Sequence, residues 1–174
     1  MVKPIIFFFV NVGILYVSWS YLDKPRSRGF SRFLTFESIL ILFLINVNSW
    51  FYNPFSLFQI ASWVLLIISL YFIIHSVYLL WLIGKPENGF ENTTKLVTGG
   101  IYRYIRHPMY SSLLFFAWGV FFKGSSLISA VLVIFTTGFL IATAKLEEAE
   151  NITKFGKDYV EYMNKTKMLI PVLF

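Results

Sequence analysis

Cysteine is absent from this 174-residue chain, which excludes disulfide bonds, thiolate metal ligands and a cysteine nucleophile. Only two histidines are present, so we expect no metal site either. Charged residues make up 14% of the chain, whereas a soluble domain usually carries about 25%. This scarcity of charge, together with 57% hydrophobic residues and a mean hydropathy of +0.68, predicts an integral membrane protein.

Five apolar segments indicate an all-α, polytopic membrane fold with about five transmembrane helices. A helix of about 20 residues crosses a bilayer, and it satisfies its own backbone hydrogen bonds. The segments cover residues 4–21, 33–50, 54–82, 108–122 and 125–144. Because only Lys123 and Gly124 separate the last two, we predict that they form a helical hairpin.

The chain after the fifth segment predicts one more helix, at residues 145–164, on the cytoplasmic side. Three aromatic residues recur there at helical spacing and form one stripe: Phe155, Tyr159 and Tyr162. We expect a single membrane domain over residues 1–174. Its expected parts are three membrane helices in residues 1–83, and a polar loop, the hairpin and the C-terminal helix in residues 84–174.

The distribution of basic residues predicts the orientation in the membrane. Of 15 Lys and Arg residues, 13 fall in the links between segments one and two and between segments three and four, and in the C-terminal tail. The positive-inside rule then predicts an outside N-terminus and a cytoplasmic C-terminus. The net charge of +6 follows from this topology, so we expect membrane lipids and no nucleic acid among the partners.

The stretch LVTGGIYRYIRHPMY, residues 96–110, places an unusual polar cluster between two apolar segments. Pro108 fits the first turn of a helix, whose free backbone N–H groups favour an anion such as a carboxylate. A simple juxtamembrane anchor, in which Arg and Tyr reach the headgroups, is the alternative.

A second cluster holds three carboxylates just beyond the fifth segment, at Glu147, Glu148 and Glu150. One of these carboxylates could hold a cationic or hydroxyl-bearing ligand at the membrane surface, and a solvated helix face is the alternative. His75 and Asn46 lie inside apolar segments, where a polar side chain either serves function or bonds to a neighbouring helix.

Together the two clusters resemble the membrane methyltransferases typified by isoprenylcysteine carboxyl methyltransferase and the phospholipid N-methyltransferases. That family shows a pattern close to LVxxGxYxxxRHPxY, followed one hairpin later by a Glu-Glu pair, FGxxYxxY and a Pro. The first block is matched here by Leu96, Val97, Gly100, Tyr102, Arg106, His107, Pro108 and Tyr110. The second block is matched by Glu147, Glu148, Phe155, Gly156, Tyr159, Tyr162 and Pro171.

The resemblance implies an S-adenosylmethionine-dependent enzyme that methylates a lipophilic, membrane-embedded or lipid-modified acceptor on the cytoplasmic side. It implies catalytic roles for Arg106, which would orient the acceptor, and for Glu148, a candidate base. The implied cofactor-binding residues are Thr94, Lys95, Leu96, Val97, Gly100, Tyr102, His107, Pro108, Met109, Tyr110 and Glu147.

The acceptor atom stays open between the oxygen of an isoprenylcysteine-like carboxylate, a lipid amine nitrogen and a thiol sulfur. Thr143 stands where the carboxyl methyltransferases of the family carry an Arg, which argues against a carboxylate. Ser112 stands where many members have Gly. Two other interpretations remain, a sterol-reductase-like enzyme that binds NADPH and a non-catalytic membrane scaffold. The sequence predicts no oligomeric state.

Overall fold

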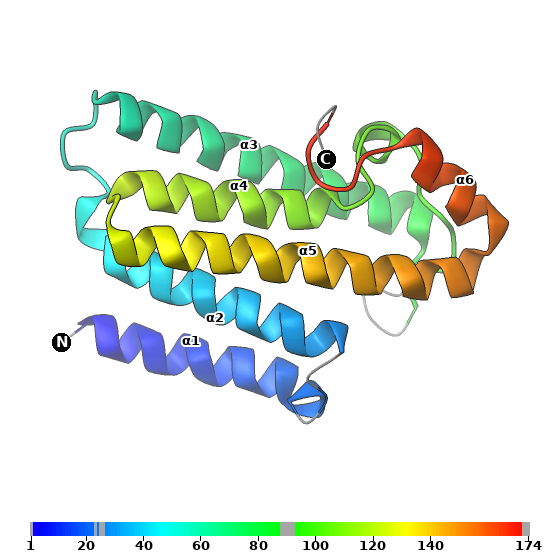
Figure 1. Cartoon of the computed structure of the whole chain (residues 1–174), viewed down its shortest axis with the longest axis horizontal. Helices are drawn as coiled ribbons and strands as arrows, with labels where there is room; N and C mark the ends of the chain where they lie inside the picture. The colour runs from blue at the N-terminus through cyan, green and yellow to red at the C-terminus, as the bar shows by residue number, and fades with distance from the viewer. Residues whose placement is uncertain (1, 23, 25–26, 88–92, 172–174) are drawn as a thin grey trace. The chain divides into compact units, whose positions relative to one another are not determined.

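The computed structural model describes residues 2–22, 24, 27–87 and 93–171. Over these residues the chain forms six α-helices joined by loops, 3-10 turns and one π-helical turn, with isolated β-bridges in place of strands (Figure 1). The predicted all-α fold is therefore confirmed for the described residues. The helices are α1 Val2–Ser18, α2 Arg28–Asn46, α3 Leu57–Leu79, α4 Pro108–Lys123, α5 Leu127–Phe155 and α6 Lys157–Lys165.

Among the described residues, three helical stretches are long and apolar enough to cross a membrane: Arg28–Ser49, Leu57–Gly84 and Leu127–Phe155. The apolar part of α1, Lys3–Ser18, is shorter, and α4 has 16 residues. The expected five crossings are thus supported for three helices, and for α1 and α4 they remain a prediction. The predicted start of α4 at Pro108 is confirmed.

The predicted end of the fifth helix is wrong. We expected the helix to end near residue 144, but α5 continues without a break to Phe155, so all three carboxylates of the second cluster lie on it. Gly156 then ends α5 with φ +60° and ψ −134°, a conformation open essentially to glycine alone. The shorter α6 follows it, in place of one helix over residues 145–164.

The chain divides into two compact units. The first comprises residues 1–66 and 114–146, in which α1 packs along α2. Its core joins three helices through Leu42 of α2, Ala117 and Val120 of α4, and Val133 of α5. Close packing is helped by Gly119, whose carbonyl accepts a 2.7 Å hydrogen bond from a serine of α3.

A buried lysine closes one end of this first unit. Lys123 is 4% exposed, and its Nζ donates to Gln59 Oε1 at 2.9 Å and lies 3.5 Å from the ring centroid of Trp63. Gln59 Nε2 in turn donates to the backbone oxygens of Ser49 and Lys123. Asn46, whose role the sequence left open, bonds to Ser129 and therefore connects α2 to α5.

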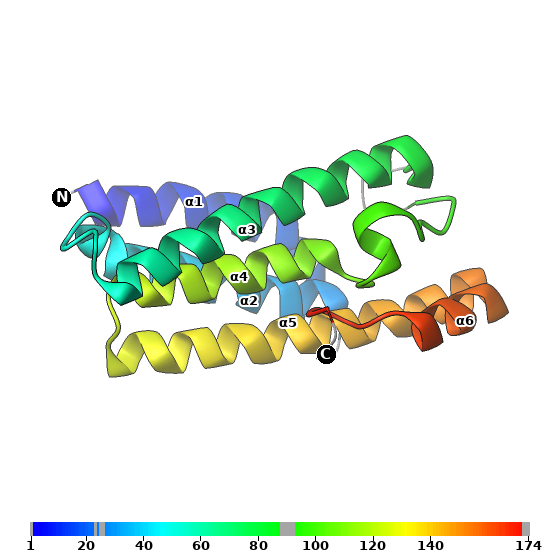
Figure 2. The same cartoon turned by 90° about the horizontal axis from the view of Figure 1, so that it is seen from above.

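The second unit comprises residues 67–113 and 147–174 and contains the polar stretch of the sequence. After Gly156, α6 turns back beside the end of α5, and the chain that follows it runs along the loop before α4 (Figures 1 and 2). Here Lys167 N donates to Tyr104 O at 3.0 Å, Arg106 N donates to Lys167 O at 2.8 Å, and His107 N donates to Met168 O at 3.1 Å. We call this backbone pairing, between residues 104–107 and 167–168, the bracket.

Candidate active site

A cavity in the second unit gathers residues that are far apart in the sequence. It encloses about 680 Å³ of space between atoms, its open mouth included. Its walls come from the end of α3, the loop before α4, the first turn of α4, the end of α5, and α6. The lining residues are Leu80, Thr93, Leu96, Val97, Tyr102, Arg106, His107, Pro108, Met109, Tyr110, Glu147, Asn151, Phe155, Tyr159 and Tyr162.

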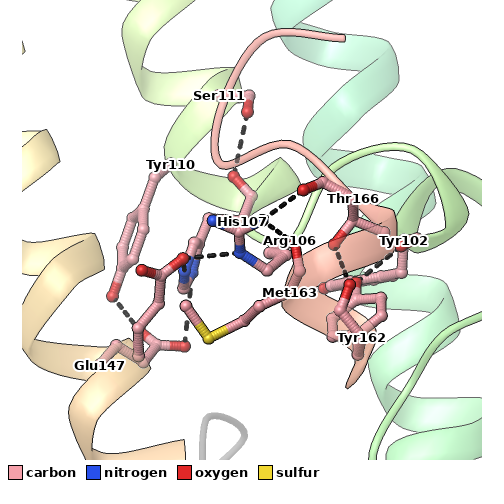
Figure 3. A network of polar contacts seen from close by, with 10 residues as sticks. Tyr102, Arg106, His107, Tyr110, Ser111, Glu147, Tyr162, Met163 and Thr166 are labelled. Carbon is pink, nitrogen blue, oxygen red and sulfur yellow. Dashed lines mark hydrogen bonds and ion pairs between the residues drawn. The ribbon is translucent and has the colours of Figure 1, made fainter. Parts of the chain in front are cut away.

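Arg106 is fixed in this cavity from two sides (Figure 3). Its Nε donates to Glu148 Oε1 at 2.6 Å, and both side chains are only 9% exposed. Its Nη1 donates to the backbone oxygens of Met163, in the last turn of α6, and of Thr166, the first residue after α6. The guanidinium therefore has a defined position, which a freely moving surface arginine lacks.

His107 directly precedes α4 and lies buried between the two glutamates. Its Nε2 is 3.4 Å from Glu148 Oε1, and its Nδ1 is 3.8 Å from Glu147 Oε1. Nε2 has no hydrogen-bond partner of good geometry among the described residues, although it is shielded from solvent. Its ring stacks on Tyr110, with 5.5 Å between centroids. The Nε2 atom is thus available to form a hydrogen bond with a ligand or to accept a proton.

Adjacent glutamates on α5 serve different partners. Glu147 accepts a hydrogen bond from the hydroxyl of Tyr110 and lines the cavity, whereas Glu148 turns toward Arg106. Neighbouring residues on a helix project about 100° apart, so each glutamate has its own hydrogen-bond donor, although both lie within 4 Å of His107. Glu147 therefore presents its carboxylate to the cavity, and Glu148 binds Arg106 from outside the cavity lining.

Three tyrosines form a buried aromatic wall. Tyr162 of α6 donates a 2.6 Å hydrogen bond to the backbone oxygen of Tyr102 (Figure 3). Burial raises the pKa of Tyr102, and the neighbouring Tyr162 and Glu147 add to this effect. Burial likewise raises the pKa of Tyr162, and it raises the pKa of Tyr159 to about 12 despite a hydrogen bond with Asn151. All three hydroxyls are therefore neutral at physiological pH.

Nine of the residues expected at the site line the cavity: Leu96, Val97, Tyr102, Arg106, His107, Pro108, Met109, Tyr110 and Glu147. Four others stand outside its lining. Thr94 closes the preceding loop, with its hydroxyl donating to Lys85 O at 3.0 Å, and Lys95 N donates to Gly84 O at 3.2 Å.

Gly100 and Glu148, the other two, support the cavity from behind. Gly100 adopts φ +59°, and a Cβ placed on it would lie 2.6 Å from Leu79 Cδ1 and 3.2 Å from His75 Nε2. The glycine therefore lets the loop approach α3 closely. His75 itself stacks on Tyr71 of the same helix.

Six cavity residues were absent from the expected site: Leu80, Thr93, Asn151, Phe155, Tyr159 and Tyr162. The last three belong to the second sequence block and could have been included on that ground. Asn151 lies one helical turn after Glu147, so helical spacing could have identified it once α5 was known to continue. Leu80 sits in the π-helical turn after α3, which no sequence signal marks.

Comparison with known proteins gives concordant matches. The model of the phospholipid methyltransferase family matches residues 57–158. Methanethiol S-methyltransferase of Crocosphaera subtropica is 25% identical over 179 residues, which cover 89% of this chain and 65% of that protein. Methanethiol S-methyltransferase 1 of Bradyrhizobium diazoefficiens is 28% identical over 169 residues, which cover 87% of this chain and 56% of that protein.

The chain thus spans between half and two thirds of the length of these two relatives. No solved structure matches it.

Proposed function

The chain belongs to the phospholipid methyltransferase family, and we propose that it transfers a methyl group from S-adenosylmethionine to a lipophilic acceptor taken from the membrane. One observation carries this proposal. Arg106, His107 and Glu147 meet an aromatic wall in a single cavity at the point where the apolar helix α4 begins. Such a cavity offers polar anchors and an apolar approach to the same place.

The residues of the cavity fit S-adenosylmethionine by their chemistry. Glu147 can accept hydrogen bonds from amino or ribose hydroxyl groups, and the buried Nε2 of His107 offers a further polar contact. Tyrosine faces can lie against a sulfonium cation, a contact of about 1 kcal/mol or more when water is excluded.

Arg106 and Glu148 are the proposed catalytic pair. S-adenosylmethionine supplies an already activated methyl group, so the protein has to align the acceptor and exclude water, which can lower a barrier by about 7–11 kcal/mol. Arg106 would orient the acceptor. A thiol or amine must also release a proton, and we propose that His107 takes it while the carboxylate of Glu148, 3.4 Å away, stabilises the resulting imidazolium.

We propose a thiol as the acceptor. Both relatives reported above are named as methanethiol S-methyltransferases, and a small neutral thiol needs no carboxylate-binding arginine at position 143. Thr143 occupies the position at which the carboxyl methyltransferases carry a carboxylate-binding arginine. Its side chain is 1% exposed, and its hydroxyl donates to Phe139 O within the same helix. A lipid amine is the second candidate, because the family model is that of phospholipid methyltransferases. The cofactor would enter from the cytoplasm and the acceptor from the bilayer.

Binding of S-adenosylhomocysteine tests the site. We expect calorimetry in detergent to detect binding by the wild type, and a loss of tenfold or more, about 1.4 kcal/mol, for both Arg106→Ala and Glu147→Ala. Glu161→Ala is the matched control, because Glu161 is an exposed carboxylate paired only loosely with Lys165. Normal binding by both site variants would remove the assignment.

Transfer of a labelled methyl group tests the reaction. Methanethiol, larger thiols and total membrane lipid are offered in parallel, and methyl transfer to the thiols is the expected result. Exclusive labelling of lipid would favour the amine acceptor. Thermal stabilisation by NADPH without stabilisation by S-adenosylmethionine would favour the reductase-like alternative. A scaffold would tolerate simultaneous replacement of Tyr102, His107 and Glu147.

A further inference from the structure

A second hollow in the second unit is rich in positive charge. It encloses about 900 Å³ of space between atoms, its open mouth included, and shares no lining residue with the cavity described above. Its lining residues, all of them described, include three cations and no carboxylate. They are Arg103, Tyr104, Met163, Asn164, Lys165, Thr166, Lys167 and Pro171.

Each of the three cations belongs to a backbone segment that is ordered by hydrogen bonds. Lys167 belongs to the bracket, where its N–H and its carbonyl both bond to the loop before α4. Arg103 ends the 3-10 turn Gly100–Arg103, directly before the bracket. Lys165 ends α6, and its Nζ lies 3.9 Å from Glu161 Oε2, but both side chains are more than 70% exposed, so this pair neutralises little charge.

The hollow lies close along the chain to the start of an apolar helix. Arg103 and Tyr104 precede Pro108, the first residue of α4, by five and four residues. Tyr104 is 63% exposed, and an exposed tyrosine beside basic residues is typical of the headgroup region of a membrane. Position and charge therefore both fit a ligand that sits at the surface of the bilayer and carries negative charge.

We propose that this hollow binds the phosphate-bearing headgroup of an anionic membrane lipid. Basic residues at a membrane surface attract anionic lipids, and arginine forms paired hydrogen bonds with phosphate oxygens. The backbone pairing of the bracket keeps Lys167 next to the segment that carries Arg103, so the site needs little ordering when lipid binds. A lipid headgroup fits better than free phosphate, because the hollow is also lined by the exposed Tyr104, and tyrosine is the kind of side chain that lies at the level of the headgroups.

Arg106, which lines the cavity, is hydrogen-bonded to residues that line the hollow. The guanidinium of Arg106 donates to the backbone oxygens of Met163 and Thr166, and both residues line the hollow. Lipid bound in the hollow would hold these carbonyls in place and thereby the arginine. We therefore expect an anionic bilayer to tighten S-adenosylhomocysteine binding, and this second expectation rests on the proposed function.

Lipid retention tests the headgroup site without any assay of activity. The protein is placed in nanodiscs of phosphatidylcholine with or without phosphatidylglycerol, extracted gently, and analysed for bound lipid by native mass spectrometry. The test variant carries Arg103→Gln, Lys165→Gln and Lys167→Gln. Since one basic residue near the surface contributes about a fivefold preference, we expect phosphatidylglycerol retention to fall by about fivefold to 100-fold.

Two further variants separate the site from general charge. The control replaces three exposed lysines outside the hollow, Lys24, Lys85 and Lys157, by Gln, which removes the same charge and should reduce retention clearly less than the test variant does. Arg103→Lys with Lys165→Arg and Lys167→Arg keeps the charge and should retain lipid like the wild type. Circular dichroism and thermal melting identify any variant that fails to fold.

Three results would overturn the proposal. The first is equal retention by the wild type and the test variant, and the second is an equal loss in the control variant. The third is displacement of the lipid by excess inorganic phosphate, which would indicate a site for free anions. If lipid retention behaves as expected while S-adenosylhomocysteine does not bind at all, the headgroup site stands and the proposed function fails.

Discussion

The buried pair of Arg106 and Glu148 allows the sharpest prediction. Replacing Glu148 by Leu leaves the guanidinium with two backbone carbonyls and no countercharge. Replacing Arg106 by Met leaves the carboxylate with only His107 among the described residues, 3.4 Å away, and leaves the same two carbonyls without this donor. Because both side chains are only 9% exposed, water can repair little of either loss. Removing one partner of such a pair costs about 3 kcal/mol or more.

The double variant should be less damaged than the two single variants added together. It has no buried charge without a partner, so the loss should be about 3–4 kcal/mol, where simple addition of the single losses would give about 6 kcal/mol. The pair therefore has an expected coupling energy of about 2–3 kcal/mol. In melting temperature, each single variant should lose roughly 6–12 °C.

Thermal melting in detergent, followed by circular dichroism, measures all four proteins of this cycle. Lys165→Met with Glu161→Leu provides a matched control cycle on α6, because that pair is 3.9 Å apart and exposed. Its coupling energy should stay below about 0.5 kcal/mol. If the losses for Arg106 and Glu148 add within about 0.5 kcal/mol, the two side chains act independently and the reasoning fails.

Three further predictions concern backbone strain, the buried lysine and pH. Gly100→Ala should lower the free energy of unfolding by about 1–3 kcal/mol through its positive φ and the contact with α3, while Gly99→Ala, with φ −94° and no atom nearer than 4.0 Å, should be neutral in the same melts. Trp63→Leu should destabilise the wild type by about 1–2 kcal/mol more than it destabilises a Lys123→Met background, as measured by unfolding, because the cation–π contact exists only in the wild type. Raising the pH from about 10 to about 12 should lower the free energy of unfolding, because the pKa of a tyrosine is near 10 in the unfolded chain and that of Tyr159 is about 12 in the folded protein. Tyr159→Phe should therefore reduce the fall in melting temperature with pH over this range, and an unchanged fall would contradict the prediction.

The sequence predicted the start of α4 correctly and misplaced the end of α5. Pro108 fixes the start of α4, because proline suits only the first turn of a helix. The end of α5 was misplaced because the composition turns polar after residue 144. Lys, Leu, Glu and Ala are all good helix formers, so the polar run marks a change of environment and does not stop the helix. The actual stop is Gly156, whose positive φ no L side chain adopts easily.

Nine of the expected site residues line one cavity because the two sequence blocks keep their spacing. The sequence could not predict which polar side-chain atoms form hydrogen bonds within the fold and which remain available in the cavity. Thr94 was expected at the cofactor, yet its hydroxyl bonds to Lys85, and its neighbour Thr93 lines the cavity instead. A one-residue shift in an irregular loop has no periodic signal, whereas a shift on a helix would turn the side chain by about 100°.

The paired glutamates illustrate why the same sequence motif can carry two functions. Glu147 faces the cavity and Tyr110, and Glu148 faces Arg106, because consecutive side chains on α5 point in different directions. Arg106 also depends on carbonyls after α6, and these stay in place through the bracket. The guanidinium position is therefore set jointly by the end of α5, the chain after α6 and the loop before α4. Any change that loosens the C-terminal segment should disturb Arg106 before it disturbs Glu147, although Glu147 lies next to Glu148 in the sequence.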